Sequence, residues 1–151
     1  MQADDELLDL DNQFCFALYA ASRGVVRAYG EALKALDLTY PQYLVMLVLW
    51  EWARKKNCSR PTVRALGDRL DLDSGTLTPL LRRLQEKGLI TRKRISSDER
   101  EVFVAVTPAG TRLKLRARAI PLKMLARCPI PLEQLLNLRT QLKLFRSASA
   151  A

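Results

Sequence analysis

Two apolar stripes of helical spacing, close together in residues 62–107, constrain the fold of this chain more than any other feature. The first occupies residues 63–70 and the second residues 77–84, with leucine or valine at every third or fourth position. Capping residues at positions 71–74 separate the stripes, and Gly88 suits the end of the second one. Because each stripe buries one helix face, the segment predicts a short helix, a tight turn and a second helix.

Two β-rich runs follow this second helix. They span Leu89–Ile95 and Glu101–Thr107, and a connection of residues 96–100 joins them. Valines alternate along the second run, as in a half-buried strand. The order of helix, turn, helix and basic hairpin is that of a winged helix-turn-helix, which binds DNA.

The leucine face of the second helix must point inward, which turns its polar side chains outward. Hydroxyls near a helix N-terminus and arginines suit phosphates and base edges. Cations along the hairpin suit a narrow minor groove, where negative potential is concentrated. The alternative interpretation is a solvated helical hairpin beside an ordinary β-ribbon. The candidate DNA-binding residues are Ser74, Thr76, Thr78, Arg82, Arg83, Arg92, Lys93, Arg94 and Arg100.

The net charge of +9 supports a polyanionic partner only weakly. Residues 62–107 hold 9 basic and 7 acidic side chains, whereas residues 108–151 hold 9 and 1. Most of the excess therefore lies outside the expected DNA-reading segment. Binding must depend on where individual arginines point.

Helices are expected before the winged unit. Leu10–Leu36 carries apolar residues at helical spacing, and Asp11 is the predicted N-cap. A break at residues 37–41 follows. Pro41 then suits the first turn of a second helix that runs to about Arg54.

Helices are also expected after the winged unit. Thr107-Pro108 predicts the start of one helix, which Pro121 should kink or end, and Pro129 and Pro131 precede the last helix. The sequence thus predicts a mainly α chain with a small β-hairpin wing, an α+β arrangement, in a single domain of residues 1–151.

Composition excludes several classes of protein. The longest apolar run, Tyr43 to Trp50, is far shorter than the about 20 residues of a membrane helix. The acidic N-terminus is no secretory signal, so we expect a soluble, cytoplasmic protein without a membrane partner. The absence of histidine removes the commonest metal ligand and the usual general base. We therefore expect no metal, no other cofactor and no hydrolase triad.

Four motifs in the winged segment and just after it are distinctive. They read Asp73-Ser-Gly-Thr-Leu-Thr-Pro-Leu-Leu-Arg-Arg-Leu, Lys87-Gly-Leu-Ile-Thr-Arg-Lys-Arg, Asp98-Glu-Arg and Val106-Thr-Pro-Ala-Gly. Together they resemble the multiple antibiotic resistance regulators. The resemblance implies a homodimer, joined by helices of residues 8–54 and 108–146, that binds a palindromic double-stranded DNA operator. It also implies that Arg100 enters the minor groove and that Asp98 helps to hold the wing.

Two N-terminal stretches are more specific. They read Leu10-Asp-Asn-Gln-Phe-Cys-Phe-Ala-Leu-Tyr-Ala-Ala-Ser-Arg and Leu38-Thr-Tyr-Pro-Gln-Tyr-Leu-Val-Met-Leu-Val-Leu-Trp-Glu. They resemble the organic hydroperoxide resistance repressors, a branch of the same family. The resemblance implies that organic hydroperoxides oxidise Cys15 and that Tyr29 and Tyr40 of the other subunit bind it. It further implies that Cys128 resolves the oxidised sulfur as an intersubunit disulfide, while Cys58 is interpreted as a surface thiol.

The residues around Cys15 agree with this chemistry. The first helical turn favours a thiolate through the positive end of the helix dipole. Phe14, Phe16 and Tyr19 add apolar and aromatic surface that suits an alkyl or acyl hydroperoxide. The alternative is a buried structural cysteine with core tyrosines.

The spacing of Cys15 and Tyr29 adds a geometric condition. Fourteen residues span about 21 Å along one straight helix. The two side chains therefore meet only if the helix breaks, or if two chains pack antiparallel about a two-fold axis.

We therefore predict a redox-sensing repressor, not an enzyme, that binds its operator when reduced and is released when organic hydroperoxide oxidises Cys15. Two alternatives stay open. One is a repressor released by reversible binding of a phenolic ligand, with Cys15 structural. The other is a thiol peroxidase that consumes peroxide. The operator, the target gene and the preferred peroxide do not follow from the sequence.

Overall fold

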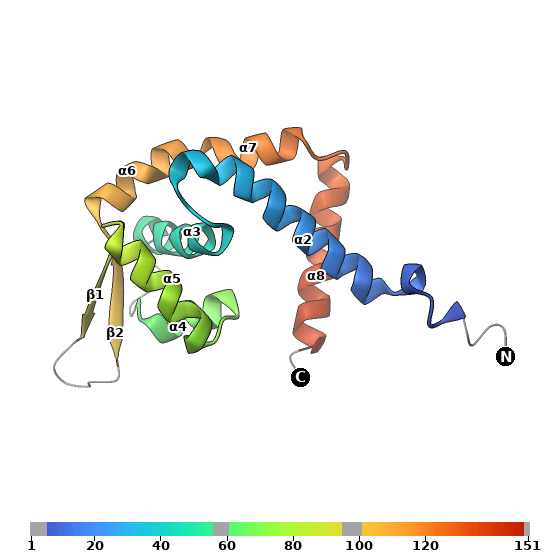
Figure 1. The fold of residues 1–151 in the computed structure, drawn as a ribbon, viewed down its shortest axis with the longest axis horizontal. Coiled ribbons are helices and arrows are strands. Elements are labelled where there is room, and N and C mark those ends of the chain that lie inside the picture. Colours follow the sequence, from blue (N-terminus) through green and yellow to red (C-terminus); the bar gives the residue numbers. More distant parts are fainter. Residues whose placement is uncertain (1–5, 56–60, 95–100, 150–151) are drawn as a thin grey trace. The chain divides into compact units, whose positions relative to one another are not determined.

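The computed structural model describes residues 6–55, 61–94 and 101–149. It is mostly helical, with one β-hairpin, as predicted (Figure 1). The chain divides into two compact units, residues 1–118 and residues 119–151. In chain order the elements are η1 (Leu10–Asn12), α2 (Phe14–Leu33), η2 (Lys34–Leu36), α3 (Tyr40–Lys55), α4 (Val63–Leu70), α5 (Ser74–Glu86), β1 (Ile90–Arg94), β2 (Val102–Val106), α6 (Pro108–Ala117), α7 (Ala119–Ala126) and α8 (Leu132–Ser149).

Helix α3 is the centre of the first unit. It packs against α2, α4, α5, α6 and β2. Pro41 lies in its first turn, as predicted, where the missing N–H breaks no helical bond. The apolar run that follows faces neighbours on several sides, so most of residues 42–50 are buried. Its buried side chains are Gln42, Tyr43, Val45, Met46, Val48, Leu49 and Trp50.

Helices α4 and α5 form the predicted helix-turn-helix. Thr62 caps α4 by accepting a hydrogen bond from the Ala65 N–H at 3.1 Å. Gly67 allows the turn to pass close to the helix, because a Cβ there would lie 2.8 Å from the Leu72 carbonyl oxygen. Both predicted stripes face the core. Their fully buried members are Leu66, Leu77, Leu81 and Leu84.

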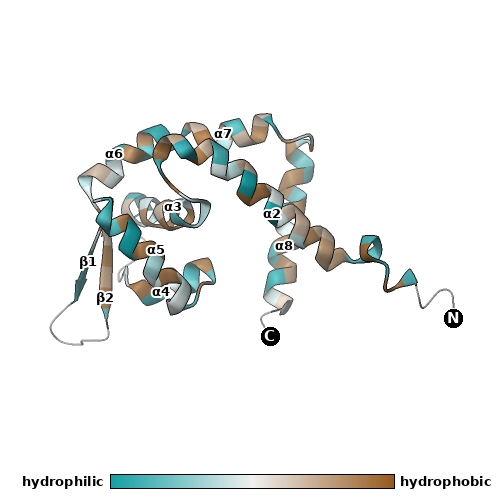
Figure 2. Cartoon of the chain, viewed as in Figure 1, coloured by the Kyte–Doolittle hydropathy of each residue, from teal (hydrophilic) through white to brown (hydrophobic). Residues whose placement is uncertain are grey.

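Strands β1 and β2 form the predicted antiparallel hairpin. Ile90 lies opposite Val106, and Arg94 lies opposite Val102. β2 is hydrophobic and β1 hydrophilic (Figure 2). Ile90 and Val104 are 1% exposed, and β2 packs on α3 and α4 while β1 packs on α5. The hairpin is thus fixed to the helix-turn-helix at its base, and its connection, residues 95–100, lies outside the described residues.

The start of α2 corrects the prediction that Asp11 caps this helix. Asp11 lies inside η1, and the N-cap is Gln13, which is extended and makes no side-chain capping bond. The reason is that the short 3-10 turn already uses residues 10–12, so the α-helix begins later. At its other end α2 stops at Leu33, and Asp37 turns the chain in the left-handed region at φ +52°, which aspartate tolerates.

The break predicted at Pro121 lies earlier in the chain. α6 ends at Ala117 and α7 starts at Ala119. Pro121 therefore falls in the first turn of α7, where it removes no helical hydrogen bond. The start of α6 is as predicted, since the Thr107 hydroxyl oxygen accepts from the Gly110 N–H at 3.0 Å.

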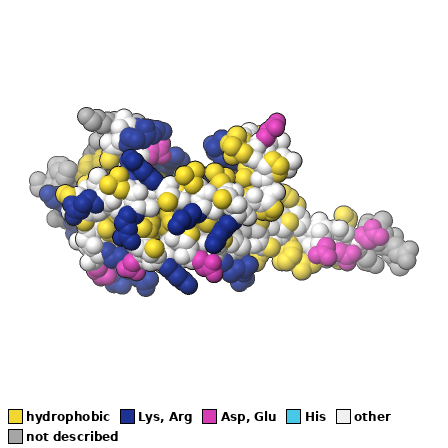
Figure 3. All heavy atoms as spheres, turned by 90° about the horizontal axis from the view of Figure 1, so that it is seen from above, with side chains coloured by type: hydrophobic (Ala, Val, Ile, Leu, Met, Phe, Trp, Pro, Cys, Tyr) yellow, Lys and Arg dark blue, Asp and Glu magenta, His cyan; other side chains and the backbone are white. Residues whose placement is uncertain are grey.

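Large apolar side chains are exposed on α2 and α8. None of the residues of α8 whose burial the structure describes is buried. Figure 3 shows apolar side chains between lysines and arginines on the face seen from above. Large exposed apolar patches mark sites of interaction with other molecules. The exposed large residues of α2 are Phe14, Phe16, Tyr19, Val25 and Val26.

Within the described ranges, no helix combines the length and the apolar character needed to cross a membrane.

The base of the hairpin gives a first prediction. A Cβ on Gly110 would lie 2.3 Å from the Leu89 carbonyl oxygen and 2.7 Å from Val106 Cγ2. We predict that Gly110→Ala lowers the free energy of unfolding by about 1–3 kcal/mol, as overpacking does. Thermal unfolding at fixed protein concentration measures this. Thr111→Ala is the control, because that residue is exposed and alanine favours a helix; equal Tm values for the two variants would contradict the prediction.

Candidate functional site

Cys15 occupies the second position of α2, in the first helical turn, as predicted. Its side chain is exposed. Phe14 and Tyr19 are 57% and 58% exposed, and Phe16 is 38% exposed. In a single chain the thiol therefore stands on an open aromatic surface. The assignment of these three aromatic residues to a pocket stays a prediction.

Arg23 joins this surface, although the sequence analysis did not single it out. Its Nη1 donates to the Tyr19 hydroxyl oxygen at 3.1 Å, and its guanidinium carbon lies 5.6 Å from the centroid of the Tyr19 ring. Cys15, Tyr19 and Arg23 follow at intervals of four residues, which places them on one face of α2. This four-residue spacing is the feature of the sequence from which Arg23 could have been predicted. Arg23 thus holds the Tyr19 hydroxyl on the thiol-bearing face.

Three tyrosines gather at the other end of α2. The ring centroid of Tyr29 lies 4.7 Å from that of Tyr40 and 6.0 Å from that of Tyr43. The structure therefore brings together the two predicted sensor tyrosines and adds a third. Tyr43 is 2% exposed. Tyr43 was not predicted, although it follows Tyr40 by three residues, a spacing that puts both on one helix face.

Burial raises the pKa of all three phenols, because removal of water disfavours the charged phenolate. The neighbouring Tyr29 raises the pKa of Tyr40 further. Both neighbours raise the pKa of Tyr43 in the same way, to about 12. The cluster is therefore neutral at physiological pH, and its hydroxyls remain hydrogen-bond donors.

Helix α2 keeps the thiol and the tyrosines apart. It runs without interruption from Phe14 to Leu33. Cys15 and Tyr29 therefore lie about 21 Å apart along its axis, at 1.5 Å per residue. A site that contains both groups requires a second chain.

Of the other two cysteines, the structure describes Cys128 but not Cys58. Cys128 follows α7 in the second unit, where its N–H donates to the Leu125 carbonyl oxygen at 3.1 Å and its side chain is half-buried. Its role as resolving cysteine stays a prediction. Cys58 lies outside the described residues. Within the described ranges, the cysteines, aspartates and glutamates form no group that could hold a metal ion.

Asp73 fixes the start of α5. Its Oδ1 accepts from the Thr76 N–H at 2.8 Å, and its Oδ2 accepts from the Thr76 hydroxyl at 2.9 Å. These bonds, the backbone one first, hold the pKa of the carboxyl below its ordinary value. The hydroxyl proton of Thr76 is thus directed to the cap. Ser74 and Thr78 are the exposed hydroxyls that remain to donate to a phosphate.

A groove of about 830 Å³ runs between α4, the first half of α5 and the hairpin. Ser74 and Thr78 line it from the helix, and Arg92 and Arg94 line it from β1. Arg82 follows Thr78 by four residues, so it extends the same exposed face of α5. Its ion pair with Glu86, at 3.7 Å, is exposed and contributes little stability. Predicted residues of the helix and of the wing therefore share one concave surface.

The cations of β1 have different surroundings. The Nε of Arg92 donates to the Gln85 side-chain oxygen of α5 at 2.6 Å, and this side chain is half-buried. Lys93 and Arg94 are exposed. Arg92 thus ties the wing to α5, whereas Arg94 lines the groove with an exposed side chain and Lys93 does not line it. The predicted wing residues Asp98 and Arg100 lie outside the described residues.

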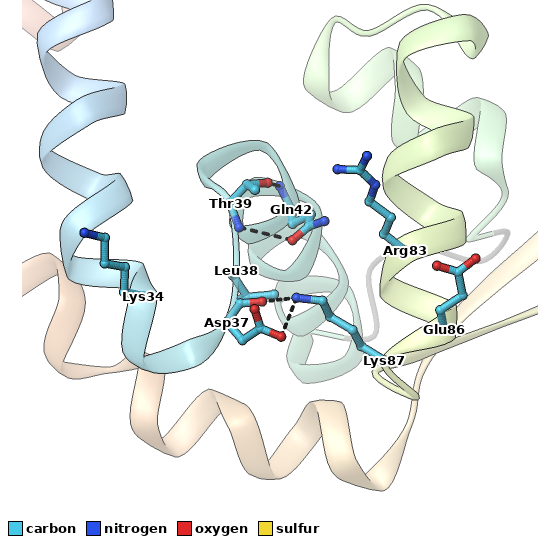
Figure 4. A pocket seen from close by; sticks show the side chains of 8 residues that line it. All are labelled: Lys34, Asp37, Leu38, Thr39, Gln42, Arg83, Glu86 and Lys87. Atoms are coloured by element: carbon cyan, nitrogen blue, oxygen red, sulfur yellow. Dashed lines mark hydrogen bonds and ion pairs between the residues drawn. The ribbon is translucent and has the colours of Figure 1, made fainter.

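Lys87 connects the end of α5 to the turn between α2 and α3. Its ammonium donates to the Asp37 carbonyl oxygen and pairs with Asp37 Oδ2 at 2.7 Å (Figure 4). Arg83 points into the same hollow, towards Gln42 at the start of α3. Arg83 therefore lines this hollow and not the groove that Ser74 and Thr78 line.

The chain is similar to known transcription regulators. Residues 27–116 match the family described as transcriptional regulator SarA/Rot. An organic hydroperoxide resistance transcriptional regulator of Bacillus subtilis (strain 168) is 48% identical over 114 residues, which are 76% of this chain and 74% of that protein. Two solved structures of AbfR, a protein of Staphylococcus epidermidis, share the fold. Reduced AbfR bound to DNA matches with a TM-score of 0.77 and 30% identity over 100% of both chains. Disulfide-formed AbfR matches with a TM-score of 0.63 and 33% identity over 95% of this chain and 97% of that one.

The raised pKa of Tyr43 predicts a pH dependence of stability. The folded chain keeps this proton to about pH 12, whereas the unfolded chain loses it near 10. The stability that Tyr43 contributes is therefore complete below pH 10 and is lost as pH rises through 12. Urea unfolding between these pH values should show a smaller loss of unfolding free energy in Tyr43→Phe than in the wild type. Equal losses would rule out a buried Tyr43 hydroxyl.

Proposed function

This chain belongs to the organic hydroperoxide resistance regulators of the multiple antibiotic resistance family, and from that premise we propose that it is a peroxide-sensing repressor. The reduced homodimer binds palindromic double-stranded operator DNA in the cytoplasm. Oxidation of Cys15 by an organic hydroperoxide releases the DNA.

One observation carries the proposal: the exposed thiol and the tyrosine cluster stand at opposite ends of one unbroken helix. An antiparallel pair of α2 helices would bring Cys15 to the partner's Tyr29 and the partner's Tyr40. The exposed apolar face of α2 supplies the surface for that pairing. Phe14, Phe16 and Tyr19 would then line a pocket for the organic part of the peroxide.

The chemistry follows from these groups. The Cys15 thiolate attacks the peroxide oxygen that is remote from carbon, and the O–O bond breaks. The sulfur is oxidised to sulfenic acid while the peroxide is reduced to an alcohol. Neutral tyrosine hydroxyls stabilise the departing alkoxide, which takes a proton from solvent. The thiol of the partner's Cys128 then attacks the sulfenic sulfur, so that a disulfide forms and water leaves.

The output is a change in how the dimer presents two recognition helices. Residues 62–107 act as the DNA-binding unit, and residues 8–54 with 108–146 act as the dimerisation and sensor helices. Oxidation repacks those helices and moves the two DNA-binding units. Half-sites must match their separation, so a modest shift abolishes tight binding.

Two other functions would give different experimental results. A repressor that binds a phenolic ligand reversibly would release DNA without any change in the mass of Cys15. A thiol peroxidase would consume peroxide through many turnovers with a reductant. The matched family consists of transcription regulators, which favours a single oxidation as a signal.

We predict that Arg82→Ala weakens binding of the reduced dimer to its operator by about 1–3 kcal/mol, the scale of one bidentate arginine contact. Arg83→Ala should weaken it less, because Arg83 points towards Gln42. Fluorescence anisotropy with a labelled duplex, selected from random sequences, measures both. Arg112→Ala is the charge-matched control, because Arg112 is exposed on α6. An equal loss in all three variants would mean that total charge alone sets the affinity.

We predict that cumene hydroperoxide lowers the operator affinity of the wild type but not of Cys15→Ser. Serine cannot form a sulfenic acid, so the variant should bind like the reduced protein before and after treatment. Cys128→Ser should still gain a sulfenic acid at Cys15, without forming a disulfide between subunits. Anisotropy and intact mass after treatment report both outcomes. Release of Cys15→Ser by cumene hydroperoxide would overturn the proposed function.

A further inference from the structure

An aromatic chain leads from the sensor tyrosines into the core of the first unit. Tyr43 packs on Tyr29, with 6.0 Å between ring centroids, and its ring meets that of Trp50 edge-on at 6.4 Å. Tyr43 and Trp50 are 2% and 4% exposed. They lie seven residues, or two turns, apart on one face of α3. A change in the packing of Tyr29 therefore acts on a helix that also carries Trp50.

Trp50 in turn bonds to the base of the wing. Its indole N–H donates to the Gly110 carbonyl oxygen at 2.9 Å, in a buried position. Gly110 cannot move independently of the hairpin, because its Cα lies against the Leu89 carbonyl and the Val106 side chain. Leu89 directly precedes β1, and Val106 ends β2.

Two further hydrogen bonds hold the base of the wing. The Thr107 N–H donates to the Leu89 carbonyl oxygen at 3.0 Å, and the Thr107 hydroxyl donates to the Gly88 carbonyl oxygen at 2.6 Å. The start of α6 and both ends of the hairpin base therefore form one rigid joint. The indole of Trp50 reaches this joint from α3.

We propose that Tyr43 and Trp50 are positioning residues that transmit the redox state of the sensor to the wing. This inference rests on the proposed function and adds the route by which the redox signal passes through each subunit. When oxidation of the partner's Cys15 repacks Tyr29 and Tyr40, α3 shifts. The Trp50–Gly110 hydrogen bond carries the base of the wing with it.

The buried bond suits this role better than the contact between Lys87 and Asp37. That pair also joins the sensor helices to α5, but the side chain of Asp37 is 90% exposed. Exposed ion pairs contribute little energy. A buried hydrogen bond is expensive to leave unmade, so Trp50 and Gly110 move together.

Trp50→Phe tests the link, since it keeps an aromatic ring and removes only the N–H. The quantity to measure is the ratio of operator Kd for protein oxidised with cumene hydroperoxide to the Kd for reduced protein. We expect this ratio to fall by about three- to tenfold relative to the wild type, the effect of losing one hydrogen bond. The rate of sulfenic acid formation at Cys15 should stay unchanged, which a general structural defect would not allow.

Trp52→Phe is the matched control, the same substitution two residues further along α3, and it should keep the wild-type ratio. Tyr43→Phe should also keep it, because the ring remains, whereas Tyr43→Leu should lower it. A wild-type ratio in Trp50→Phe, or an equal fall in Trp52→Phe, overturns the link. A ratio of one in the wild type would instead overturn the proposed function, so the two failures are distinguishable.

Discussion

Helix α2 holds Cys15 and Tyr29 about 21 Å apart along its axis in each chain, and the proposed redox site depends on this separation. A cysteine with its hydrogen-bond donors in the same chain would be complete in a monomer. Here the helix is continuous, so the proposed redox site needs two chains. A change in the oxidation of sulfur is then also a change at the subunit interface, and no separate signal to the interface is required.

Helix α3 connects this interface to the winged unit. It contributes Tyr40 and Tyr43 to the aromatic cluster, Trp50 to the base of the wing, and a buried surface to α4 and α5. The winged unit itself is nearly balanced in charge, with 9 basic and 7 acidic side chains in residues 62–107. Its affinity for DNA therefore depends on orientation more than on total charge, and orientation is what a central helix can control.

Local signals in the sequence predicted the winged segment well. The bounds of α4, the buried leucines of α5, the Thr107 cap and the positive φ of Gly88 all follow from caps and periodicity within a few residues. The family resemblance is likewise confirmed. What the sequence analysis missed depends on contacts between distant segments: the packing of Tyr43 on Tyr29, and the bond from Trp50 to Gly110, 60 residues away. The wrong N-cap at Asp11 shows the same limit, since an extra 3-10 turn displaced the helix start.

Mixed dimers test whether each redox site takes its thiol from one chain and its tyrosines from the other. One chain carries Cys15→Ser, and the other carries Tyr29→Phe with Tyr40→Phe; two affinity tags isolate the mixed dimer. The thiol of the double-phenylalanine chain then faces intact tyrosines of its partner. We predict that cumene hydroperoxide oxidises this thiol at the rate of a wild-type site, while the homodimer of the same chain reacts slowly. A mixed dimer as slow as that homodimer would contradict this prediction.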